Sequence, residues 1–165
     1  MAHSDVPRVH LDYCFFTEDS KDEQGEATRT SLTTLVMKES ECKSLWAYPV
    51  MHKGAANEPW VVKQIIYDLE TVGLGNERIV MKNDQEPAIK DLRAEVARQR
   101  GAATAAEESR VGDSNSSATI EVPVQEVENM TGTLRSSLES RLKSKIKLDH
   151  RIVPWLIRHS VASIM

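Results

Sequence analysis

Arg78-Ile-Val-Met-Lys-Asn-Asp-Gln-Glu-Pro-Ala-Ile-Lys-Asp-Leu92 is the stretch of sequence that decides the fold. The apolar run Ile79 to Met81 predicts a short strand that ends in Asp84, and a helical pattern with Pro87 in its first turn then opens. In α/β sheets the carboxyl ends of strands face the crevice in which ligands bind. Asp84 is therefore a candidate site residue, although a carboxylate in this position also commonly caps a turn.

The order of predicted strands and helices along the rest of the chain places this stretch in a mixed sheet. Three strand patterns precede it, a helix separates them from it, and a possible short strand, a long amphipathic helix and a final helix follow. The expected strands are 9–16, 30–37, 42–50, 79–81 and 102–106, and the expected helices are 58–72, one opening at Ala88, one through Leu142 and one after Pro154. Three strands in succession favour an antiparallel meander, and the crossovers then add parallel strands, so the fold class is α/β.

Two polar segments read as loops within a single domain of residues 1–165. Residues 17–29 are acidic and contain Gly25, which favours a loop or a disordered hairpin tip, and residues 107–118 favour a mobile loop. Asn57 is the expected N-cap of the first helix.

Composition narrows the class of protein. The chain has 165 residues, 40% hydrophobic and 28% charged, and no apolar run long enough to cross a bilayer. The two cysteines, Cys14 and Cys42, form no disulfide framework, so we expect an intracellular protein with both thiols packed in strands. The net charge of −4 argues against a general nucleic-acid binder. The C-terminal segment 135–158 is nevertheless rich in Lys and Arg, which indicates either a solvated helix face or a surface for phosphates.

Three carboxylates stand at positions that could meet at one sheet edge. Asp12 lies in the middle of the first strand, where it either faces solvent or needs a partner or a metal. If the first and fourth strands are neighbours, Asp12 lies beside Asp84, and Glu121 at the start of the long helix leans over both. Glu126 and Glu128 are weaker alternatives for the third acid. Three carboxylates suit Mg²⁺ or Mn²⁺, but acids are common, so the spacing alone is a weak signal.

The sequence also resembles a known family in four ordered motifs. These are Val9-His-Leu-Asp-Tyr-Cys-Phe, Trp46-Ala-Tyr-Pro-Val, Lys82-Asn-Asp-Gln-Glu-Pro-Ala-Ile and Val111-Gly-Asp-Ser-Asn-Ser-Ser-Ala-Thr-Ile-Glu121. They are similar to the catalytic core of retrotransposon and retroviral integrases, the DDE group of the ribonuclease H-like fold. The resemblance runs from about Arg8 to Trp155, and the spacing from Asp84 to Glu121 is close to the family's.

The resemblance implies a metal-dependent polynucleotidyl transferase that trims the 3′ ends of an element's DNA and joins them to target DNA. Asp12, Asp84 and Glu121 would hold two Mg²⁺ or Mn²⁺ ions. Residues 113–117 would belong to the active-site loop, where Asn115, Ser116 and Ser117 would contact DNA, as could Lys82. We expect the chain to bind DNA and further copies of itself, and not to bind a membrane. The expected location is the nucleus if the source is eukaryotic.

The chain departs from the family pattern around Glu121. Ser117-Ala118 stands where the family usually has Asn-Gly, and Val122-Pro123 stands where it usually has Arg-Ala. A proline past the first turn of a helix removes a hydrogen bond and costs about 3 kcal/mol or kinks the helix. Two other function classes therefore stay open: an inactive nucleic-acid-binding or interaction module derived from an integrase, and a ribonuclease H-like nuclease.

Overall fold

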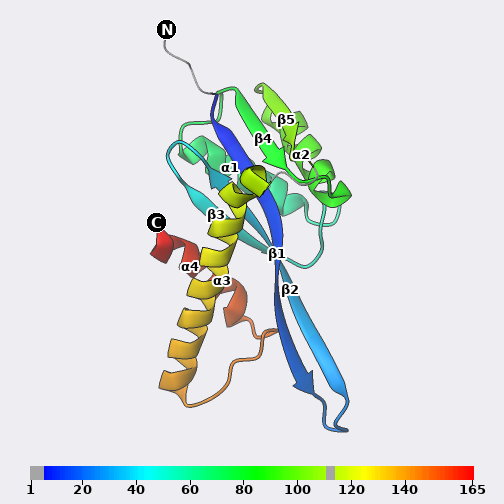
Figure 1. Ribbon diagram of the computed structural model, residues 1–165, viewed down its shortest axis with the longest axis vertical. Coiled ribbons are helices and arrows are strands. Elements are labelled where there is room, and N and C mark those ends of the chain that lie inside the picture. Colours follow the sequence, from blue (N-terminus) through cyan, green and yellow to red (C-terminus); the bar gives the residue numbers. More distant parts are fainter. Residues whose placement is uncertain (1–5, 111–113) are drawn as a thin grey trace.

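A five-stranded mixed sheet forms the centre of the protein (Figure 1). The computed structural model describes residues 6–110 and 114–165. The strands are β1 (Arg8–Lys21), β2 (Ala27–Glu39), β3 (Leu45–Val50), β4 (Ile79–Asn83) and β5 (Thr104–Glu108), in the order β3-β2-β1-β4-β5. β1, β2 and β3 pair antiparallel, whereas β4 and β5 join the sheet in parallel. The predicted meander with added parallel strands is confirmed.

Four helices cover the two faces of this sheet: α1 (Pro59–Thr71), α2 (Pro87–Arg100), α3 (Ser114–Leu142) and α4 (Ile152–Ile164). α1 and α2 each begin with proline, whose missing N–H is not needed in the first turn. α2 ends at Gly101, which is left-handed with φ of 69°, a conformation that glycine adopts without a steric cost. Among the described residues, no helix has both the length and the apolar character to cross a membrane.

Alternation along the first half of β1 directs its apolar side chains to two cores. Val9, Leu11 and Tyr13 are buried in the cluster that includes the apolar faces of α1 and α2. Cys14 belongs to the second cluster, with residues of α3 and α4. Because successive strand residues point to opposite faces, Asp12 lies on the α3 side of the sheet.

The expected acidic loop at residues 17–29 is wrong, because β1 and β2 continue through most of it as a two-stranded ribbon. Their antiparallel pairing runs from Val9↔Glu39 to Lys21↔Ala27, so only residues 22–26 form the turn. The turn is closed by Asp22, whose Oδ1 accepts the N–H groups of Gln24 and Glu26 at 3.0 and 2.7 Å. The β-branched threonines of β2 favour a strand, and their contribution outweighs the charge of the segment.

Three smaller boundaries also differ from expectation. Asn57 is not the N-cap of α1; that residue is Glu58, which makes no side-chain capping bond to the helix. The fifth strand is shifted by two residues, to 104–108, because parallel pairing with β4 sets its register. α4 begins before Pro154, at Ile152, since proline is tolerated within the first turn of a helix.

Cys42 is exposed rather than packed in a strand, because β3 starts only at Leu45. The turn that holds it is built on Glu39, whose carboxylate accepts the N–H groups of Glu41 and Cys42 at 2.9 and 2.7 Å. Cys14 is buried in β1 as expected.

The expected mobile loop at 107–118 is wrong at both ends. Residues 107 and 108 are the last of β5, and α3 begins at Ser114; residues 111–113 lie outside the described part of the chain. Pro123 therefore lies in the interior of α3, where it has no N–H to donate to the carbonyl of Thr119. Its side chain is buried against the rest of the protein, which offsets part of that cost.

An ionic cluster ties the ribbon to α3 and to the segment before α4. Glu18 of β1 accepts the backbone N–H of Leu148 at 2.8 Å and a hydrogen bond from the Arg135 guanidinium. Arg135 of α3 also donates through Nε to the carbonyl of Ile146 at 2.9 Å. The N–H of Leu148 and the guanidinium of Arg135 lower the pKa of Glu18, so the folded state favours its charged form.

We expect Arg135→Met to destabilise the protein by about 2 kcal/mol, because it leaves a partly buried carboxylate and a carbonyl without their charged donor. A lowered pKa contributes stability that is present above the ordinary glutamate range and lost as the pH falls through the folded-state value. The effect should therefore shrink near pH 3. Urea unfolding at pH 7 and pH 3 measures it, with Lys145→Met as the control, because that ammonium is 92% exposed and its pair with Glu139 contributes little. Equal losses in both variants would contradict the role of Arg135.

Candidate metal site at the β1–β4 edge

The pairing of β1 with β4 brings Asp12 and Asp84 together. The two strands are parallel and pair as far as His10 opposite Lys82; Asp12 lies two residues beyond that pair on β1, and Asp84 lies two residues beyond it, directly after β4. Both residues line a small hollow of about 160 Å³, together with Glu121 from α3. The other lining residues are His10, Leu11, Lys82, Asn83, Ser109 and Ile120. The predicted neighbourhood of the first and fourth strands is therefore present, and all three predicted carboxylates face one hollow.

Asp12 carries an electrostatic strain that a cation would relieve. Burial raises its pKa to about 6, and the neighbouring charge of Asp84 adds to the shift. Glu86 acts in the same direction, whereas a backbone N–H bond at Tyr13 and the ammonium of Lys53 act against it. Asp12 and Asp84 together form an oxygen-rich, negatively charged donor set, which suits Mg²⁺ or Mn²⁺.

Asp84 also has a structural role in the turn. Its Oδ1 accepts the backbone N–H of Glu86 at 3.0 Å, one residue before α2 begins. Asn83, buried in β4, donates to the carbonyl of Asp84 and is itself held by Arg93, which donates to its Oδ1 at 2.7 Å. Turn capping and a place in the hollow are thus both properties of Asp84, and neither excludes the other.

Glu121 is the least constrained of the three acids. It is exposed, and it is carried by α3 next to Ile120, which is buried in the second core and fixes the rotation of the helix. Among the described residues, no three histidine, cysteine or acidic side chains come close enough to hold one metal ion. The pair Asp12 and Asp84 fits a divalent cation, whereas a third ligand at Glu121 requires its side chain to turn toward that pair.

Of the four predicted DNA-contact residues, the structure describes the side-chain contacts of Lys82 alone. Lys82 is held by Glu107, with Nζ to Oε1 at 3.2 Å, and its side chain is only 13% exposed. It therefore lines the hollow as one half of an ion pair rather than as a free cation. Asn115, Ser116 and Ser117 lie in the first turn of α3, and their side-chain surroundings fall outside the described part of the structure.

Two neighbours of the site were not anticipated from the sequence. His10 lies two residues before Asp12 on the same face of β1; it is buried, and desolvation and the charges of Lys82 and Arg8 lower its pKa. The two-residue spacing between His10 and Asp12 in a predicted strand could have indicated that both side chains lie on one face of the sheet. Lys53, between β3 and α1, pairs with Glu86 and lies 4.9 Å from the ring centre of Tyr13, a contact between distant segments that no local pattern reveals.

Solved structures with a similar fold exist, although sequence comparison finds no relative. No protein-family model matches the chain, and no curated protein matches it in sequence. The catalytic core domain of BIV integrase is similar, with a TM-score of 0.55, 11% identity and coverage of 94% of this chain and 81% of that one. The HTLV-2 integrase catalytic core domain in complex with magnesium is similar in its dimeric form, with a TM-score of 0.56, 9% identity and coverage of 98% and 88%. Its trimeric form has a TM-score of 0.54, 10% identity and coverage of 94% and 82%.

This chain has the integrase catalytic-core fold. The integrase-core resemblance of the sequence motifs and the ribonuclease H-like sheet are thereby confirmed at the level of architecture. At about a tenth of identical residues the likeness concerns the fold alone, so the site must be argued from the side chains of this chain.

We expect Asp12→Asn to stabilise the metal-free protein at neutral pH. The folded-state pKa of about 6 lies above the ordinary value of 3.8, so folding penalises the ionised carboxylate. The penalty is absent when Asp12 is protonated in both states, grows through pH 4 to 6 and is complete above that range. Melting temperatures in EDTA should show Asp12→Asn above the parent at pH 8 and equal to it near pH 3.5. Glu23→Gln, an exposed charge on the ribbon turn, is the matched control. An unstabilised Asp12→Asn at pH 8 would contradict the electrostatic strain.

Proposed function

We propose that this protein is an integrase-like, metal-dependent polynucleotidyl transferase that acts on DNA, trimming 3′ ends and joining them to a target. The observation that carries the proposal is that Asp12 of β1, Asp84 directly after the neighbouring parallel strand β4, and Glu121 of α3 line one hollow. The fold shared with integrase cores supports it, and one of those cores is in complex with magnesium.

Asp12 and Asp84 would hold the first Mg²⁺ or Mn²⁺ ion, and Glu121 would complete the set. Bound divalent ions supply an activated attacking oxygen and charge stabilisation for the leaving oxygen in phosphodiester chemistry. The protein's own contribution is positional. The β1–β4 ladder brings the two aspartates to one edge of the sheet, Asn83 and Arg93 hold the turn after β4, and the ion pair of Lys82 with Glu107 neutralises a cation within the hollow.

Asp84→Asn separates the two roles of this residue. Asparagine keeps the Oδ1 acceptor for the Glu86 N–H, so the turn survives, but it removes the negative charge. If Asp84 binds a metal, Mn²⁺-dependent strand-transfer product should fall at least a hundredfold, and the melting temperature should lose its dependence on Mn²⁺. If Asp84 only caps the turn, both readouts stay as in the parent. Asp91→Asn is the control, since Asp91 accepts from the backbone at Ala55 outside the hollow.

An inactive DNA-binding module is the second candidate, and α3 supplies the observation that favours it. Pro123 removes a backbone hydrogen bond from the helix two residues after Glu121. The three acids line one hollow, but among the described residues no three such side chains come close enough to hold one metal ion. If neither the parent nor Asp84→Asn yields product while duplex DNA still binds, this second function holds. Gain of activity in Val122→Arg/Pro123→Ala would then assign the loss to the damaged start of α3.

We also propose that the protein assembles with further copies of itself. The HTLV-2 core domains occur as a dimer and as a trimer. Here α4 exposes Trp155 at 56%, stacked on His159 with ring centres 4.8 Å apart, and α1 exposes Tyr67 at 61%. Large aromatic side chains are costly to leave in water and are enriched at protein interfaces.

Trp155→Glu should shift the protein toward the monomer in light scattering or sedimentation at micromolar concentration, because a charge would be buried at the interface. Phe15→Glu is the control, because Phe15 is 46% exposed but lies on β1, in neither helix. A parent protein that is already monomeric at all concentrations would contradict the assembly proposal.

A further inference from the structure

The C-terminal end of α3 carries a cationic surface that the site at the β1–β4 edge does not use. We define this α3-end surface as Arg141 in the last turn of α3, Lys143 directly after the helix, and Lys147 and Arg151 in the segment that leads from there to α4. All four side chains are exposed, and among the described residues none of them takes part in an ion pair. Asp149 is the one acid within the segment they occupy. The surface is therefore strongly positive in a chain whose net charge is −4.

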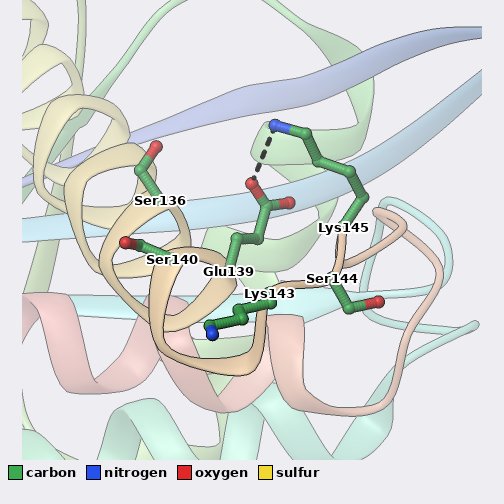
Figure 2. Close-up of a pocket in the computed structure, with 6 residues that line it drawn as sticks. All are labelled: Ser136, Glu139, Ser140, Lys143, Ser144 and Lys145. Carbon is green, nitrogen blue, oxygen red and sulfur yellow. Dashed lines mark hydrogen bonds and ion pairs between the residues drawn. The ribbon is translucent and has the colours of Figure 1, made fainter.

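The neighbouring charges are already paired, which leaves these cations available. Glu139 accepts the backbone N–H of Ile146 at 2.8 Å and bonds Lys145 at 3.3 Å. Figure 2 shows Glu139 and Lys145 joined in this way, while Lys143 extends in another direction from the end of the helix. Lys143, Lys145, Glu139 and three serines line an open hollow of about 340 Å³ there. Serine hydroxyls and ammonium groups donate hydrogen bonds of the kind that phosphate oxygens accept.

Lys143 adopts a backbone conformation that is unfavourable for lysine. Its φ is +52°, and Ser144 N–H bonds the carbonyl of Glu139 at 3.3 Å, which closes the last turn of α3. Glycine is the usual residue in this position because a Cβ is strained there. Complementing the helix dipole does not account for the choice, since Arg141 already lies in the last turn and Lys147 and Arg151 lie beyond the helix.

The path along α3 between the candidate metal site and this surface is compatible with a polyanion. Between residues 125 and 140, the exposed residues of α3 are mainly small or uncharged hydrogen-bonding residues: Gln125, Asn129, Gly132, Thr133, Ser136, Ser137 and Ser140. Glu126 is the exposed acid on this part of α3, and it lines a separate hollow with Lys38 and Lys43 near β3. A surface helix usually carries charged pairs instead.

The length of α3 sets the register of the partner. The helix rises by about 32 Å between Glu121 and Leu142, at about 1.5 Å per residue. One turn of duplex DNA is about 34–36 Å, or about 10 base pairs. A duplex that lies along α3 with one phosphodiester at Glu121 therefore presents a backbone of the same orientation again at the end of the helix.

We propose that the α3-end surface binds the backbone phosphates of duplex DNA one helical turn away from the reacting phosphodiester. The proposal rests on the proposed function for its choice of DNA as the polyanion. It assigns no base recognition, because Lys and Arg contacts to phosphates position a duplex without reading its sequence.

Salt-dependent DNA binding in EDTA tests the surface without requiring catalysis. Each phosphate contact contributes about one to the slope of log K against log salt concentration. Lys143→Gln/Lys147→Gln should reduce the slope by about two, and it should weaken binding of a 20-base-pair duplex while leaving an 8-base-pair duplex nearly unaffected. Lys63→Gln/Arg78→Gln removes the same charge from exposed positions on α1 and before β4, and it should change neither measurement.

An unchanged slope in Lys143→Gln/Lys147→Gln, or an equal loss in both double variants, overturns the proposal. An equal loss for the short and long duplexes overturns the one-turn spacing. Failure of the proposed catalytic function is recognised separately, because it abolishes Mn²⁺-dependent product in the parent and leaves the slopes in EDTA untouched. Circular dichroism of each variant verifies the fold, and Lys143→Gly, which relieves the backbone strain while removing the charge, should lower the slope by about one.

Discussion

The parallel ladder between β1 and β4 is the contact on which the site depends. It is short, with three paired positions from Arg8↔Val80 to His10↔Lys82, and it ends just before both aspartates. Beyond the last pair, Asp12 and Asp84 line a hollow together with Glu121 of α3. A one-residue slip would send Asp12 and Asp84 to different positions along the edge and would turn one of them to the opposite face. The core residues Val9, Leu11, Ile79 and Met81, all buried, hold this register.

The sequence was informative where local chemistry and periodicity agree. Pro87 at the start of α2, the glycine that ends it and the strand-end position of Asp84 all follow from backbone rules that need no tertiary information. The ribbon of β1 and β2 did not follow, because its stability comes from cross-strand pairing and from Glu18 contacting residues more than a hundred positions away. The same holds for Lys53 beside Tyr13 and Glu86. Long-range contacts of this kind leave no periodic trace in the residues that make them.

The candidate site is also where the fold works against its own stability. Two carboxylates share a partly buried hollow, and a proline breaks the hydrogen-bond ladder of the helix that carries the third. Proteins tolerate such destabilising features where function needs them, and other parts of the fold compensate for the lost stability. Here the compensation is visible in the two apolar clusters on either side of the sheet and in the charged network of Glu18, Arg135 and Glu139. That network anchors the far end of α3, away from the proline.

The ribbon formed by β1 and β2 has a topological consequence. β4 pairs with β1 only as far as His10, and β3 pairs with β2 only from Thr33 onward, so residues 11–21 and 27–32 each present one strand edge without a neighbour in the sheet. Open edges of this length are templates for uncontrolled strand addition. Charged residues such as Asp19 and Arg29, facing each other across the ribbon, oppose such addition because a dry, flat interface would bury them. The free-energy cost of burying these charges thus protects the exposed edges of the long hairpin against pairing with another strand.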